Sequence, residues 1–206
     1  MFSANDWLSR LLRMGSWSPF EHVVLVFKGP LQSEKSRGLE AQYKNKLRIF
    51  QATFSHYKTD VKGIRTEKDG VNLYDFDEVL ANQRLFGAKA YVCKLNCSNQ
   101  SEKRKLLDEK MAIEISNHID EEYAMEDLIQ CLAGKSIGYF NKQGESKHRW
   151  ACSTIIAEIF KQAGIFKNNV NLYSFFPGSY SSTKLDVKCC FVKGMNLGIE
   201  QKLIYH

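Results

Sequence analysis

The chain has 206 residues, enough for one folded domain with a hydrophobic core, and we expect residues 1–206 to form that single domain. Apolar residues make up 44% of the chain, and the formal net charge is +6. This charge is modest, and lysine and arginine are interspersed with acidic residues instead of forming a basic stripe with aromatic residues. The pattern argues against nucleic acid as a partner.

The cellular compartment can be predicted from the length of the apolar runs and from the cysteines. The first twenty residues contain no apolar run long enough for a signal peptide, and no segment approaches the roughly 18 apolar residues that span a membrane. We therefore expect a cytoplasmic protein whose six cysteines are reduced. Cys93 and Cys97 have no matching second pair, so we expect neither a metal site nor a cofactor. The adjacent Cys189 and Cys190 lie in an apolar run, which predicts packing within a strand.

The first half of the chain alternates between apolar strands and polar segments. Residues 1–17 are predicted to form an N-terminal helical extension, whose apolar face at 7–14 packs on the domain or contacts a membrane surface. The β-branched run 22–27 predicts a buried strand. Residues 31–46 are polar and predict a surface excursion, and 47–54 predict a second strand with one polar residue inside it.

The second half contains more helices. Its order predicts an α+β domain, with a mostly antiparallel sheet and helices packed to one side. The predicted elements are a short strand after Gly70, a helix capped by Asp75, a strand at 88–95, helices at 101–119 and 121–134, a helix from residue 152 that stops at Gly164, and a strand near 188–194.

Cys152 is the first candidate for chemistry. It begins the amphipathic stretch HRWACSTIIAEIFKQAGIF, residues 148–166. At a helix N-terminus, the positive end of the helix dipole favours the thiolate, and free backbone N–H groups can hold an oxyanion. The alternative is a small buried residue of the core, which is the usual place of a free cysteine.

A nucleophilic cysteine needs a base and a group that orients the base. His22 differs from the other four histidines because it begins a buried apolar strand. Gln51 is a polar amide inside the apolar strand 47–54, where its carbonyl could accept a histidine N–H and fix the tautomer. The structural alternatives are a strand-end histidine and a solvent-facing glutamine, and the residues alone leave both open.

Three separated pieces of sequence together resemble a known family. They are EHVVLVFKG; then RIFQATFSHYK, GVNLYDFDEVL and AKAYVCKL; and finally WACSTIIAEIFKQAGI. The series resembles the circularly permuted papain-fold cysteine hydrolases, the YiiX-like branch of the NlpC-type superfamily, which has poxviral members. The resemblance runs from about Glu21 to Ile165, and its most specific part is CSTIIAEIFKQAGI.

The resemblance implies a circularly permuted papain-like fold and a thiol hydrolase or acyltransferase that cleaves an amide or ester through a thioester. It implies Cys152 as nucleophile and His22 as general base. Gln51 stands where the family often has glutamate, so an amide would orient the imidazole without a charge. Val24 replaces a glycine of the family pattern.

The substrate stays open among peptides, isopeptides and lipids, as does contact with a membrane surface. We expect Tyr139 and Trp150 to line the substrate pocket beside Ser153, and the segment 177–182 to form another wall. Three other hypotheses remain, namely a binding module or pseudoenzyme on the same fold, a lipid-directed acyltransferase or phospholipase and, least favoured, a basic nucleic-acid-binding protein. The sequence sets no oligomeric state.

Overall fold

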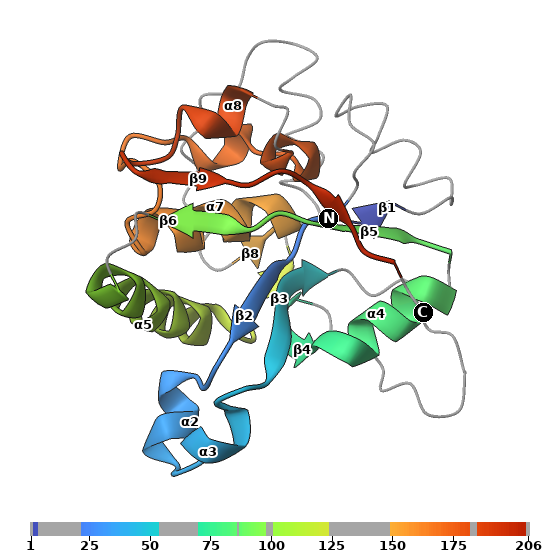
Figure 1. Ribbon diagram of the computed structural model, residues 1–206, viewed down its shortest axis with the longest axis vertical. Helices are drawn as coiled ribbons and strands as arrows, with labels where there is room; N and C mark the ends of the chain where they lie inside the picture. Colours follow the sequence, from blue (N-terminus) through green and yellow to red (C-terminus); the bar gives the residue numbers. More distant parts are fainter. Residues whose placement is uncertain are drawn as a thin grey trace.

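The computed structural model describes residues 2–3, 22–53, 70–85, 87–97, 101–123, 149–181 and 185–204. These form an α+β arrangement of small sheets and helices (Figure 1). The strands are β1 (Phe2–Ser3), β2 (Leu25–Lys28), β3 (Leu47–Thr53), β4 (Gly70–Asp75), β5 (Lys89–Val92), β6 (Leu95–Cys97), β7 (Glu122–Tyr123), β8 (Arg149–Trp150), β9 (Met195–Leu197) and β10 (Gln201–Lys202). The helices are α2 (Gln32–Ser36), α3 (Glu40–Tyr43), α4 (Phe76–Leu85), α5 (Ser101–His118), α7 (Cys152–Gln162) and α8 (Leu185–Lys188), with 3₁₀ turns η1 (Leu172–Ser174) and η2 (Pro177–Tyr180).

The antiparallel sheet β2-β3-β4 includes Gln51, one of the predicted site residues. Strand β3 lies in the middle, and both of its faces are buried, because Ile49, Phe50, Gln51 and Ala52 are all at most 3% exposed. Successive side chains of a strand point to opposite faces, so each face needs its own cover. The prediction of helices on one side is therefore wrong: α5 and α7 cover one face, and α4 covers the other.

Helix α7 supplies much of the core. Every residue from Cys152 to Ala157 is buried, as are Ile159 and Phe160, and this helix packs against β3 and α5. The helix ends as the sequence predicts. Gly164 has φ +78°, a conformation that L side chains rarely adopt, and the next N–H, from Ile165, returns to the carbonyl of Phe160 at 2.7 Å.

A second set of strands crosses above the first sheet in Figure 1. Strand β5 pairs with β1 and β10, and β6 pairs with β9. The predicted strand 88–95 thus appears as β5 and β6, with a short break between them. The predicted strand near 188–194 is wrong, because α8 ends at Lys188 and a turn follows. Cys189 is exposed in that turn, so the cysteine pair does not pack within a strand.

The segment after α5 also differs from its prediction. A helix is expected from 121, yet Glu122 and Tyr123 form β7, which pairs in parallel with β8. The turn at Asp120, with φ +72°, ends the helical path. The backbone then bonds to β4: Asp120 donates its N–H to Val71, and Val71 donates its N–H to Glu121, both at 2.8 Å. These bonds hold the chain in extended form beside β4.

The polar excursion 31–46 folds into α2 and α3 at the end of the β2–β3 pair, low in Figure 1. A buried Arg48 joins it to the sheet through hydrogen bonds to the Glu34 carboxylate and the carbonyl of Gly29. The predicted helical extension 1–17 and the membrane contact at 7–14 lie outside the described residues, apart from β1. In the part of the chain that the structure describes, no helix is both long and apolar enough to cross a bilayer.

Candidate active site

Cys152 is the first residue of α7 and lies directly after the short strand β8. Ala151 at the N-cap has no polar side chain, so Thr154 closes the helix start instead. Its hydroxyl oxygen accepts the N–H of Ala151 and donates to the carbonyl of the same residue, both at 3.1 Å. This bonding fixes the first turn, where backbone N–H groups have no partner within the helix. The Cys152 side chain is 3% exposed.

His22 lies three residues before β2, so the predicted strand 22–27 begins later, at Leu25. Val23, the next residue, donates its backbone N–H to the sulfur of Cys152. The backbone N–H groups of Cys152 and Ser153 also point to this sulfur. The backbone N–H groups of Val23, Cys152 and Ser153 therefore act on one thiol, although Val23 is 129 positions away from Cys152. The residue next to His22, which the sequence singled out separately, thus lies beside the thiol.

Gln51 lies on β3, on the same face of the strand as Ile49, and its side chain reaches His22. Pairing of Leu25 with Phe50 places Gln51 diagonally across from His22 if the register is continued. The two side chains meet, with His22 Nε2 at 2.9 Å from Gln51 Oε1. A carbonyl oxygen can only accept, so Nε2 carries the hydrogen and donates it. The tautomer then leaves Nδ1 as the unprotonated, acceptor nitrogen of the neutral ring.

Burial sets the protonation states of Cys152 and His22. It raises the pKa of the Cys152 thiol to about 11, although the three backbone N–H groups oppose that rise. Burial also lowers the pKa of His22 to about 4, against the opposing hydrogen bond with Gln51. At neutral pH, the resting pair is therefore a neutral thiol and a neutral imidazole. The expected thiolate is not the resting state, since loss of hydration outweighs the field of the helix terminus.

Two tyrosines lie near enough to Cys152 for its charge to affect their pKa, and of the two only Tyr180 falls in a segment that the sequence predicted for the site. Tyr123 lies on β7 and pairs with Trp150, which is two residues before Cys152. Burial raises the pKa of Tyr123 and that of Tyr180, and in each case the nearby Cys152 raises the pKa further. Both phenols are therefore neutral donors at neutral pH. No sequence pattern marks Tyr123, because only the pairing of β7 with β8 brings it to the cysteine.

The predicted substrate-binding residues have different outcomes. The hydroxyl of Ser153 is buried and donates to the carbonyl of Phe175 at 2.8 Å, so of this residue only the backbone N–H faces the thiol. Trp150 is placed by its backbone on β8. Tyr139 lies outside the described residues. Of the predicted wall at 177–182, residues 177–180 form η2, where the hydroxyl of Tyr180 donates to the carbonyl of Ser153 at 2.6 Å.

The arrangement has the parts needed for nucleophilic catalysis. A thiol is present, together with an imidazole held in one tautomer and N–H donors beside the sulfur. Among the described residues, no group of three or more His, Cys, Asp or Glu side chains is placed to hold a metal ion.

The comparisons with known proteins add no family to this geometry. The chain matches no protein-family model, and it matches none of the curated proteins.

Proposed function

We propose that the chain is a thiol hydrolase or acyltransferase with Cys152 as nucleophile, His22 as general base and Gln51 as the group that orients His22. The observation that carries the proposal is the junction of three segments at the start of α7. Gln51 binds one nitrogen of His22, and the residue after His22 binds the sulfur of Cys152. We infer a circularly permuted papain-like fold from this His, Gln, Cys order along the chain.

The proposed reaction begins from the neutral pair. His22 takes the thiol proton on Nδ1 as Cys152 sulfur bonds to the carbonyl carbon of an amide or ester. The backbone N–H groups at the helix start would stabilise the oxyanion. The imidazolium then gives its proton to the leaving amine or alkoxide, which leaves a thioester. Water or an amine attacks the thioester, His22 takes the proton of that nucleophile, and Cys152 regains its hydrogen.

Gln51 orients the imidazole of His22 but has no charge that would stabilise the imidazolium. A carboxylate at this place would stabilise the imidazolium, whereas an amide only fixes the ring. The pKa of about 4 at His22 agrees with a base that stays neutral until the thiol proton moves to it. A base of such low pKa is weak, so we expect a slow reaction unless substrate binding changes the surroundings of the ring.

A second candidate is a binding module that keeps the fold and has no catalysis. Its support is the raised pKa and the near-complete burial of the Cys152 thiol. Both properties make a cysteine unreactive.

One experiment separates the two candidates. The purified chain is incubated with libraries of activated acyl and peptide probes, and intact mass and peptide mapping locate any adduct. Enzymatic chemistry predicts an acyl adduct at Cys152 that is lost in Cys152→Ala and reduced in His22→Ala. Cys189→Ala is the matched control, because that thiol is exposed and lies outside the site. Labelling of Cys189 alone would support the binding module.

A further inference from the structure

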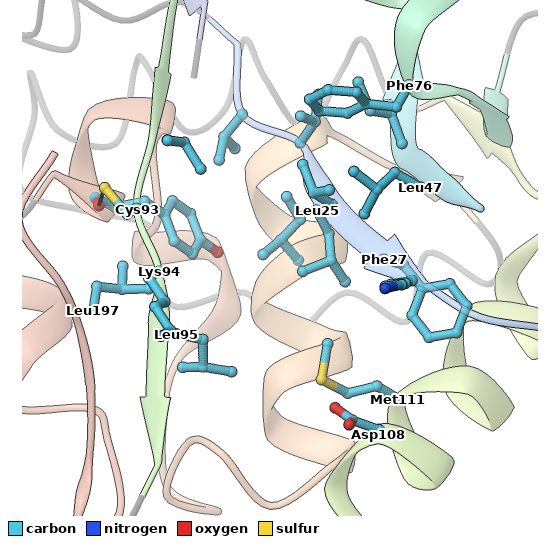
Figure 2. A pocket seen from close by; sticks show the side chains of 18 of the residues that line it. Leu25, Phe27, Leu47, Phe76, Cys93, Lys94, Leu95, Asp108, Met111 and Leu197 are labelled. Carbon is cyan, nitrogen blue, oxygen red and sulfur yellow. Dashed lines mark hydrogen bonds between the residues drawn. The ribbon is translucent and has the colours of Figure 1, made fainter. Parts of the chain in front are cut away.

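A pocket of about 740 Å³ lies along β2, the edge strand of the sheet β2-β3-β4. Strands β5 and β6 face it from the opposite side, while α5 and α7 contribute further lining residues. Figure 2 shows Leu25 and Phe27 on one side and Cys93, Lys94 and Leu95 on the other. The volume is within the range of about 300–1,000 Å³ that is typical of sites for a single small ligand.

The interior of this pocket is apolar. Leucine, phenylalanine and methionine side chains from five elements provide much of the lining, and they include Leu25, Phe27, Leu47, Leu95, Met111 and Leu197. Leu47 is 42% exposed although it is a large apolar side chain. Apolar surface of this kind gains free energy when an apolar ligand covers it.

The charged residues of the pocket are mostly cations. Four basic side chains line it, against the single acid Asp108. All four are exposed, so a ligand head group that meets them can keep contact with water. Partial burial raises the pKa of Asp108, and the neighbouring charge of Arg104 opposes that rise. The four cations are Lys28, Lys44, Lys94 and Arg104.

The pocket extends to the candidate active site. Val23 lines it and also donates its N–H to the sulfur of Cys152. Ile156, one turn after that cysteine in α7, lines it as well. So does Tyr180, whose hydroxyl binds the carbonyl of Ser153. A ligand in the pocket would therefore lie against the residues that hold the thiol in place.

From the apolar interior and the exposed cations that line it, we propose that this pocket binds one long-chain fatty acid, with its carboxylate at the lysines and its chain along β2. An extended peptide could pair its amides with the edge of β2, and it is the alternative occupant; the mainly apolar side chains around the pocket favour the fatty acid. The proposal concerns binding alone, so it does not depend on Cys152 acting as a nucleophile.

The test is a fluorescence titration with cis-parinaric acid, performed on the Cys152→Ala chain so that no acyl transfer intervenes. Palmitate should displace the probe. Octanoate, the palmitate methyl ester and the palmityl amine should each compete at least about tenfold more weakly, a difference of about 1.4 kcal/mol. Binding should occur with monomeric palmitate below its critical micelle concentration, without vesicles.

Substitutions of charged and apolar pocket residues test whether palmitate binds in this pocket. Lys44→Glu combined with Lys94→Glu should weaken palmitate about tenfold or more, and so should Leu47→Asp. Lys110→Glu reverses one charge at an exposed position of α5 outside the pocket, half the charge change of the double variant, and should change the affinity less than twofold. Circular dichroism of each variant confirms that it is folded before its affinity is compared.

Four results would overturn the proposal. They are no displacement of the probe by palmitate, equal affinity for acid and amine, an equal loss in Lys110→Glu, and binding seen only with vesicles of anionic lipid. Stronger competition by an apolar extended peptide than by palmitate would instead assign the pocket to a peptide. Failure of acyl-adduct formation at Cys152 would leave the binding result intact, so the two proposals fail separately.

Discussion

The imidazole of His22 and the amide of Gln51 are joined by a hydrogen bond of 2.9 Å between Nε2 and Oε1, from the segment before β2 to the strand β3. The bond selects one tautomer and directs the acceptor nitrogen away from the glutamine. Because this partner is uncharged, it opposes the effect of burial on the histidine pKa only weakly. The relationship leads directly to predictions about titration.

Gln51→Glu should raise the pKa of His22 well above about 4, because a carboxylate favours the imidazolium where an amide cannot. The NMR chemical shifts of the ring protons, followed against pH, measure this change. His118 is the internal control, since its Nδ1 lies 2.6 Å from the Glu121 carboxylate, far from the substitution in sequence. An unchanged His22 titration would contradict the bond between these side chains.

Cys152 should react with iodoacetamide more slowly than Cys189 at pH 8, and its rate should increase up to about pH 11. The physical reason is that burial holds the pKa of Cys152 near 11, above the ordinary thiol value of about 8.5. Quenched samples analysed by peptide mapping give both rates from one experiment, with exposed Cys189 as the reference. A plateau for Cys152 below pH 8.5 would show a stabilised thiolate instead.

The free energy of unfolding should fall as the pH decreases from about 6.5 to about 4. His22 has a pKa of about 4 when folded and about 6.5 when unfolded, so the unfolded chain binds the extra proton in this interval. The contribution is present above 6.5 and is lost as the pH falls toward 4, and we expect it to reach roughly 1–3 kcal/mol. Urea denaturation at several pH values measures it.

The His22→Gln variant is the control for this pH dependence, since it removes the titrating ring and retains a polar side chain. Its stability curve should be flatter between pH 4 and 6.5 than that of the unmodified chain. If the free energy of unfolding depended on pH equally in the two chains, the loss of stability at acid pH would be due to carboxylates elsewhere in the fold.

Tyr180→Phe should destabilise the chain by about 1–2 kcal/mol. The change removes the donor that serves the carbonyl of Ser153 at 2.6 Å and leaves that buried acceptor without this hydrogen bond. Thermal and urea denaturation measure the loss. Tyr43→Phe removes a hydroxyl from α3 but keeps the ring that Arg48 stacks over, so its effect should stay below about 0.5 kcal/mol. Equal losses in the two variants would exclude a specific role for the Tyr180 hydroxyl.

Local patterns predict several elements well. The run LRIFQAT at β3, the helix 101–118 and the helix that starts at Cys152 and stops at Gly164 all follow from apolar spacing and a glycine stop. Patterns fail where a partner element decides the conformation. Glu122 and Tyr123 have no strand signature of their own, and they are extended because the backbone next to them bonds to β4.

The candidate site also has features that local sequence patterns predict and features that they do not. Sequence by itself identified Cys152 at a helix start and two unusual polar residues in apolar strands, because position within an element is a local property. Only the tertiary structure decided that His22 bonds Gln51 and that the neighbouring N–H of Val23 reaches the thiol. It also decided the protonation of the resting pair, since desolvation depends on everything packed around a group, and no local pattern contains that information.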